Sequence, residues 1–248
     1  VISIAPTGTL VPANHLKFYI TFSEPMQRPG IFGWFRLKNL TTGEDVPRPF
    51  RHTELWSADQ KQLTLWFHPG RQKTGVNLNV EIGPVLNEGH RYELVISEKW
   101  PSERGTALGR NVTKQITAGP ADHQQPDLAR WKIVPPAAGT RQPLVVQFDE
   151  PLDAALIRSQ LRLSRPDGRP VAGTARSRHH ERQWEFVPRH KWRAGTCRLE
   201  AGNVLEDVAG NSLERPFEVD VSEEAAAEEV PPVLYRSFEI LPVSAAAP

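Results

Sequence analysis

The sequence predicts an all-β fold made of two tandem antiparallel β-sandwich domains, and three observations support this prediction. Short stretches in which apolar and polar residues alternate recur along the chain, separated by Gly, Pro, Asn or Asp. The 248 residues include 23 prolines and 17 glycines, a content that disfavours long helices. A set of motifs in the first half also recurs in the second half, in the same order.

The repeated motifs define the elements of each domain in chain order. They pair 18–26 with 144–152, 42–46 with 167–171, 65–69 with 184–188 and 105–108 with 210–213. The first pair is typical of a strand that enters a Glu-Pro turn, and the second of a hairpin turn. Because four ordered matches are hard to obtain by chance, we predict two homologous domains, at 1–119 and 126–221.

An insertion and a tail distinguish the two copies. Residues 71–85 of the first copy contain a glycine-punctuated apolar–polar alternation, which predicts an inserted loop or an extra hairpin. Residues 222–248 follow the second copy, and they begin with an acidic, alanine-rich run. The apolar stretch 233–241 within them predicts an added strand or a docking tail.

Charge and motif content exclude several classes of function. The 30 basic and 29 acidic residues leave a net charge of +1, so no global field would recruit nucleic acid, and we expect no nucleic-acid partner. No apolar stretch is long enough to cross a bilayer, so no membrane span is expected. The chain has no glycine-rich phosphate loop and no Gly-x-Ser-x-Gly elbow, which favours a non-enzymatic protein without a cofactor.

The single cysteine, Cys197, rules out an internal disulfide and a zinc site built from several thiolates. It alternates with Leu199 and Ala201, a pattern typical of a strand with one buried face. We therefore predict a buried, unreactive thiol.

Several motifs resemble a known family. In the second copy they are the Phe-Asp-Glu-Pro-Leu-Asp run at 148–153, the Pro-Asp-Gly turn at 166–168 and the Asp-Val-Ala-Gly-Asn loop at 207–211. In the first copy Ser102 and Thr106 replace the Asp and Asn of that loop. These motifs resemble the bacterial immunoglobulin-like (Ig-like) domain of the SbsA type, which occurs in tandem in S-layer and other exported proteins.

This resemblance implies two tandem Ig-like sandwiches in a protein that is exported to the periplasm or the cell surface. It implies a structural spacer or a protein-interaction module, and the family contributes no shared catalytic residues. Two alternatives remain open: a module that binds cell-wall or surface polysaccharide, and a periplasmic metal-binding Ig-like protein.

Carboxylates and histidines are the candidates for chemistry, and a structural interpretation is favoured for each. Glu24 and Glu150 occupy equivalent positions of the two copies, so we interpret them as turn residues rather than as a glycosidase pair. Asp207 and Asn211 offer oxygen ligands for calcium, but a self-bonded Asx turn is favoured. The eight histidines include no His-x-His pair and accompany one methionine, which disfavours copper, and no metal ligand is predicted.

The candidate binding surface is drawn from loops, because loops on a rigid scaffold commonly carry recognition. In the insertion it comprises Lys73, Asn77 and Asn79. Trp100 and Trp192 also lie in predicted loops, where an indole ring can stack on a sugar.

Two basic runs complete this candidate surface. Residues 176–182, which include Arg178 and His180, and residues 189–193 flank a predicted strand. Their position on either side of this strand would allow an anion-binding patch at one end of the second domain, but two separate solvated loops are the favoured interpretation.

Overall fold

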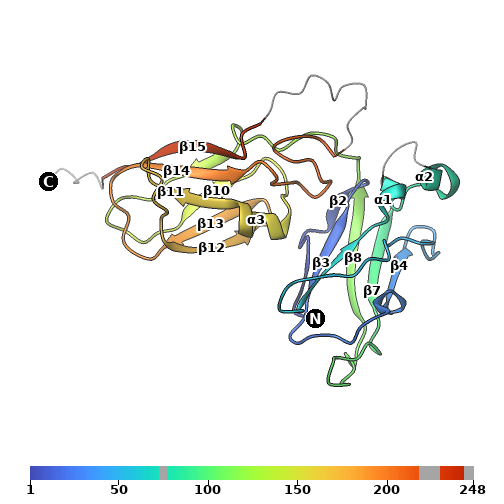
Figure 1. The fold of residues 1–248 in the computed structure, drawn as a ribbon. Helices are drawn as coiled ribbons and strands as arrows, with labels where there is room; N and C mark the ends of the chain where they lie inside the picture. The colour runs from blue at the N-terminus through green and yellow to red at the C-terminus, as the bar shows by residue number, and fades with distance from the viewer. Residues whose placement is uncertain (73–76, 218–229, 243–248) are drawn as a thin grey trace. The chain divides into compact units, whose positions relative to one another are not determined.

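The computed structural model describes residues 1–72, 77–217 and 230–242, and it confirms the all-β class (Figure 1). The chain divides into two compact units, Val1–His123 and Gln124–Pro248. Each unit consists of two β-sheets that enclose their own apolar core. The units are described separately below.

The first unit is a sandwich of two four-stranded sheets. One sheet has the order β1-β3-β6-β5, from Ser3–Ala5, Lys17–Thr21, Gln62–Trp66 and Leu55–Trp56. The other has the order β2-β8-β7-β4, from Leu10–Pro12, Val112–Gly119, Arg91–Ile96 and Phe35–Asn39, with a short 3-10 helix, Ile31–Trp34, before β4. All strand pairs are antiparallel except β2 with β8.

The period-two alternation of the strands builds the core of the first unit. Phe18 and Ile20 of β3 are fully buried, as are Leu94 and Ile96 of β7 on the opposing sheet. Successive side chains of a strand point to opposite faces, so each strand gives alternate residues to the core and the others to solvent.

The second unit has the same arrangement with one strand fewer. Its first sheet has the order β12-β13-β10-β9, from Gly173–Arg178, Gln183–Pro188, Leu144–Gln147 and Lys132–Val134. Its second sheet has the order β11-β14-β15, from Leu161–Ser164, Gly195–Gly202 and Val233–Ile240. All of these pairs are antiparallel.

A helix, α3 (Ala154–Gln160), follows the Glu-Pro turn of the second unit. Its N-cap is Asp153, whose Oδ1 accepts hydrogen bonds from the backbone N–H groups of Ala155 and Leu156, both at 2.9 Å. This cap satisfies two N–H groups that have no partner within the helix. The buried side chain of Ile157 anchors the helix to the core.

The last strand corrects the sequence-based boundary of the second domain. β15 pairs with β14 over eight residues, in the place that β8 takes beside β7 in the first unit, and its Ile240 is 1% exposed (Figure 1). The second sandwich therefore extends beyond 221 and includes the strand at 233–240.

The insertion of the first unit also differs from the expected loop or hairpin. Its described residues form two short helices, α1 (Pro69–Gln72) and α2 (Asn77–Ile82). The buried Arg71 donates to the backbone carbonyls of Gly83 at 2.8 Å and Pro84 at 2.6 Å. Gly83, at φ 74°, donates its N–H to the carbonyl of Asn79 at the end of α2. In a hairpin, the backbone carbonyls of Gly83 and Pro84 would accept hydrogen bonds from a neighbouring strand. Here the guanidinium of Arg71 donates to them instead.

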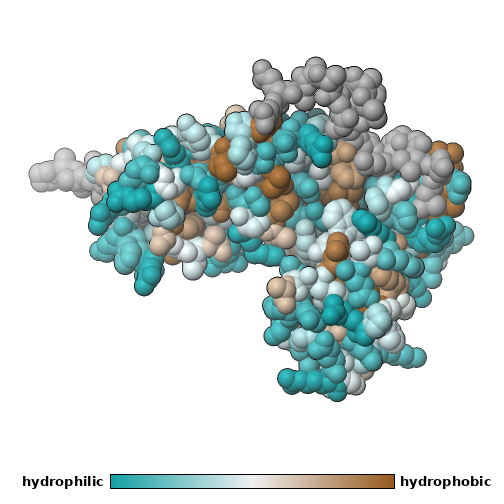
Figure 2. All heavy atoms as spheres, in the orientation of Figure 1, coloured by the Kyte–Doolittle hydropathy of each residue, from teal (hydrophilic) through white to brown (hydrophobic). Residues whose placement is uncertain are grey.

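The face drawn in Figure 2 is mainly hydrophilic, with apolar side chains among the polar ones. Single exposed apolar residues are normal for folded proteins. The charged and polar loops are therefore the candidate positions for a functional site.

Candidate functional site

A basic cavity lies in the second unit. It has a volume of about 640 Å³ and lies between the β11–β12 connection and the β13–β14 connection. Its charged lining residues are Arg165, Asp167, Arg169, His190, Lys191 and Arg193.

The β11–β12 connection forms one wall through the Pro-Asp-Gly turn. The N–H of Gly168 donates to the carbonyl of Arg165 at 2.9 Å, and the N–H of Arg165 donates to the carbonyl of Arg169 at 2.8 Å. Gly168 has φ 81°, a conformation that favours glycine, which explains its place in the turn. These bonds fix the backbone from which Arg165 and Arg169 project.

Asp167 is the acidic residue of the lining, and Arg169 neutralises it. The Nε of Arg169 donates to Oδ2 of Asp167 at 2.6 Å, and its backbone N–H donates to Oδ1 at 3.1 Å. These hydrogen bonds lower the pKa of Asp167, so its carboxylate stays ionised and paired. The other basic groups of the cavity face no competing lining carboxylate.

Trp192 anchors the β13–β14 connection. Its indole Nε1 donates to the carbonyl of Gln142 at 2.8 Å, and its backbone N–H donates to that of Thr140, also at 2.8 Å. The side chain is 3% exposed and packs on Phe186, so it is not available for sugar stacking, which corrects the expectation. Its neighbours Lys191 and Arg193 are exposed at the cavity.

The structure confirms the predicted burial of Cys197, below the same end of the unit. Its side chain is fully buried, and Nη1 of Arg165 lies 3.6 Å from its sulfur. Burial raises the pKa of the thiol, because the thiolate is the form that loses solvation. Cys197 is a core residue.

The other basic run does not join this cavity. Arg176 and Arg178 lie on β12 and pair with Glu185 on β13, at 2.8 and 3.5 Å, which lowers the pKa of Glu185. The run 176–182 precedes β13 and the run 189–193 follows it, and a six-residue strand separates its ends by roughly 17–20 Å. The two runs therefore lie at opposite ends of β13 as two separate segments, which agrees with the interpretation that the sequence favours, and they form no joint patch.

His180 lies in the turn between β12 and β13, away from the basic cavity. It is exposed, and together with His179 and Glu181 it adopts positive φ angles of 50° to 61°. Three successive non-glycine residues in this conformation form a tight connection between the two strands.

Trp100 is a core residue of the first unit rather than a surface platform. It is fully buried, and its indole Nε1 donates to the carbonyl of Gln27 at 3.1 Å. Its ring makes edge contacts with Phe22 and Phe35, each at 5.2 Å between centroids. The predicted loop position of Trp100 gave no information on its burial, because a loop can cover the open end of a sandwich.

The structure describes two of the three candidate residues of the insertion. Lys73 lies outside the described residues. Asn77 is the first residue of α2, and Asn79 uses its amide to donate to the carbonyl of Arg71 at 2.6 Å, which ties α2 to α1. A binding role for the insertion stays a prediction.

The Asp207 loop forms the Asx turn that the sequence favours. Oδ1 of Asp207 accepts from the N–H of Ala209 at 2.7 Å and of Asn211 at 3.0 Å, and Oδ2 accepts from the amide of Asn211 at 2.8 Å. Oδ1 of Asn211 accepts in turn from the N–H of Phe217 at 3.0 Å. The carboxylate therefore serves the loop itself.

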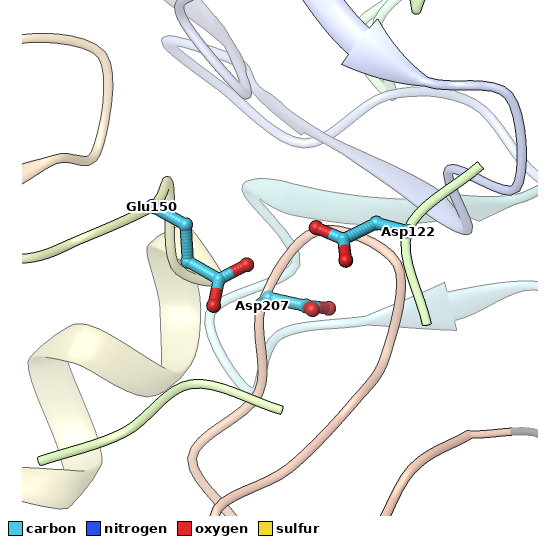
Figure 3. A group of neighbouring side chains, drawn as sticks. All are labelled: Asp122, Glu150 and Asp207. Carbon is cyan, nitrogen blue, oxygen red and sulfur yellow. The ribbon is translucent and has the colours of Figure 1, made fainter. Parts of the chain in front are cut away.

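Glu150 approaches this loop within the second unit. Its carboxylate has an oxygen within 4.8 Å of one on Asp207 (Figure 3). The third residue drawn there, Asp122, belongs to the first unit, where its backbone exchanges two hydrogen bonds with the side chain of Asn14, at 2.7 and 2.9 Å. Calcium prefers six or more oxygen ligands, and the two carboxylates of the second unit do not supply that number.

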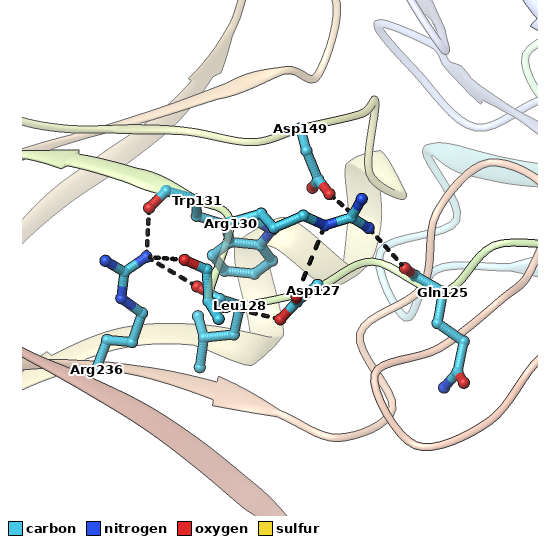
Figure 4. Close-up of polar contacts among 8 residues, drawn as sticks. Gln125, Asp127, Leu128, Arg130, Trp131, Asp149 and Arg236 are labelled. Atoms are coloured by element: carbon cyan, nitrogen blue, oxygen red, sulfur yellow. Dashed lines mark hydrogen bonds and ion pairs between the residues drawn. The ribbon is translucent and has the colours of Figure 1, made fainter.

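Arg236 on β15 was missed by sequence reasoning. Its guanidinium donates to the carbonyls of Leu128 and Ala129, both at 3.0 Å, and to that of Trp131 (Figure 4). Nearby, Arg130 pairs with Asp149 at 3.0 Å. Arg236 thus ties the last strand to the segment that enters the second unit.

Comparisons with known proteins give weak similarities. No family model matches the chain, and no curated protein matches it. The S-layer protein SbsC matches at 13% identity and a TM-score of 0.33, over 81% of this chain and 23% of that one. Domains 1–6 of SbsC match at 14% identity and a TM-score of 0.32, over 75% and 22%. A mouse coronavirus receptor-binding domain in complex with its murine receptor matches at 10% identity and a TM-score of 0.19, over 82% and 92%.

The chain thus spans less than a quarter of the SbsC chains that it matches. At these TM-scores the similarity carries no argument about function, and the all-β class rests on the strands themselves. The SbsA type stays a prediction from the motifs. Among the described residues, no helix has the length and apolar character that a membrane crossing requires.

Proposed function

We propose that this protein is a non-enzymatic, exported bacterial module that acts at the cell surface as a structural spacer and interaction platform. The observation that carries the proposal is the repetition of one sandwich architecture in two units, each with its own core. Units that bury separate cores can be placed in series, as a spacer requires. The motif resemblance to Ig-like domains of exported proteins also supports it.

The contacts of the carboxylates support a non-enzymatic role. Asp153 caps α3, Asp207 closes its own loop, and Asp149 pairs with Arg130. These carboxylates are held by structural hydrogen bonds and ion pairs, whereas an acid or base catalyst must face a substrate. Glu24 and Glu150, the pair considered for glycoside chemistry, belong to different units.

Antibody labelling of intact and permeabilised cells of the source bacterium tests the location. The expected result is labelling of intact cells that is lost after mild external proteolysis. Labelling that requires permeabilisation of the outer envelope would place the protein in the periplasm and contradict a surface role. As an accessibility control, an antibody against a cytoplasmic protein should label permeabilised cells alone.

A further inference from the structure

We propose that the basic cavity of the second unit binds an anionic glycan through clustered carboxylate groups. The cationic side chains that line the site are those of Arg165, Arg169, Lys191 and Arg193, and His190 also lines it. This binding function goes beyond a spacer role and does not depend on it.

The cavity carries an excess of positive charge. Four permanently cationic side chains line it together with one carboxylate, that of Asp167, which Arg169 already pairs. The side chains of Lys191, Arg193 and His190 form no hydrogen bond or ion pair with another described residue. Like charges held together repel one another, so an anion that bridges them is stabilised by relief of that repulsion.

Hydrogen bonds within the protein hold the backbone of the two loops that carry the cationic side chains. Arg165 and Arg169 project from a hydrogen-bonded turn, and Lys191 and Arg193 flank the anchored Trp192. A ligand would therefore order side chains without having to order the loops, which lowers the entropic cost of binding.

The volume of the cavity and the chemistry of its lining residues favour one class of ligand. A volume of about 640 Å³ lies within the range of small-molecule sites and accommodates a few sugar residues. Guanidinium groups bind carboxylate and phosphate in a bidentate manner. The indole ring of Trp192 in the lining is buried, so the cavity offers no stacking platform for a nucleobase or for a sugar ring. Single-stranded nucleic acids depend on such stacking, whereas a glycan with a charge on each sugar can bind through its anionic groups alone, which favours the glycan.

The test is isothermal titration calorimetry of the full chain with an oligogalacturonate, which carries one carboxylate per sugar. The expected dissociation constant is about 1 mM or tighter. The variant Lys191→Glu/Arg193→Glu should weaken binding at least about tenfold, because it removes two charge-assisted contacts. The matched control, Lys99→Glu/Arg110→Glu, makes the same change of net charge at exposed residues of the first unit and should bind as the wild type does. Circular dichroism melts of both variants check that they are folded.

Further ligands make the proposal falsifiable. A fully methyl-esterified oligogalacturonate has the same sugars without charge and should not bind. No heat with oligogalacturonate, equal weakening by both double variants, or equal binding of the esterified form would each overturn the site. Binding of tripolyphosphate without oligogalacturonate would overturn the glycan assignment, and so would equally tight binding of a single-stranded DNA oligomer.

Discussion

The side chain of Asp207 stabilises the loop after β14 through hydrogen bonds. It accepts three hydrogen bonds, from the backbones of Ala209 and Asn211 and from the amide of Asn211. Asp207→Ala should lower the stability of the second unit by about 3 kcal/mol, because these donors lose a charged acceptor. Differential scanning calorimetry would measure this. Asp167→Ala, at an exposed turn, should have a smaller effect, and equal shifts would contradict the prediction.

Cys197 gives a second prediction at the residue scale. The thiol is fully buried, and burial raises its pKa, so the reactive thiolate is scarce in the native protein. A chromogenic disulfide reagent at mildly alkaline pH should label the native chain at least about a hundred times more slowly than the urea-unfolded chain, because labelling requires opening of the core. Rapid stoichiometric labelling under native conditions would contradict the core assignment.

The pairing of β11 with β14 predicts an acid sensitivity at the element scale. The pKa of Glu200 is lowered by the hydroxyl of Ser164 and by Arg162, whose Nε lies 2.5 Å from the carboxylate. Its folded pKa is below its unfolded value, so the stability it contributes is present above pH 4.5, its ordinary value, and is lost as the pH falls through the folded pKa. Because Arg162 is largely exposed, the contribution should stay below about 1 kcal/mol.

Glu200→Gln should therefore reduce the loss of stability between about pH 6 and pH 3, as measured by urea unfolding at each pH. Glu214→Gln removes one carboxyl at an exposed residue of the same unit and serves as the control. Identical profiles for wild type and Glu200→Gln would show that the pair contributes nothing.

Gly173 gives a second prediction at the element scale, and here sequence and structure disagree. In a strand, alanine is commonly better than glycine, which loses more backbone freedom on folding. However, a Cβ at Gly173 would lie 2.4 Å from both Cζ of Phe186 and the carbonyl oxygen of Val187. Gly173→Ala should therefore destabilise the second unit by about 1–3 kcal/mol in urea unfolding.

Gly119→Ala is the matched control for this substitution. A Cβ there meets nothing nearer than 3.4 Å, so the stability of the first unit should hardly change. A gain in stability for Gly173→Ala would show that β13 moves away from β12 easily.

For the whole molecule, the sequence predicted the strands and turns, which depend on local patterns. It missed the features that depend on contacts between residues distant in the sequence. The strand at 144–147 and its Glu-Pro turn repeat those at 17–21, and period-two alternation is visible in a few residues. The helix at 77–82 was missed, because its partner Arg71 acts through carbonyls that no local pattern reveals. The burial of Trp192 was missed because it depends on Gln142, a distant residue.

The sequence indicated one of the two segments that line the basic cavity. It missed the other segment, because the contact between the two depends on the sheet topology. The run 189–193 is recognisable as a cluster in the sequence, and it does line the cavity. Its partners Arg165 and Arg169 come from the hairpin turn after β11, and only the sheet topology brings the two connections to one end of the unit. The run 176–182, which the less favoured interpretation joined to it, does not line the cavity because a full strand separates the two.

The place of β15 gives a prediction for the whole second unit. β15 covers β14 along its length and adds Ile240 to the core, while Arg236 holds the segment at 128–131. A fragment of residues 124–221, which ends at the sequence-based boundary, should therefore fail to fold, because the buried residues of β14 would lose their cover. A fragment of residues 124–242 should fold cooperatively. Circular dichroism melts distinguish the two, with residues 1–123 as the folded control. A cooperative transition in the shorter fragment would show that β15 is an accessory strand rather than part of the sandwich.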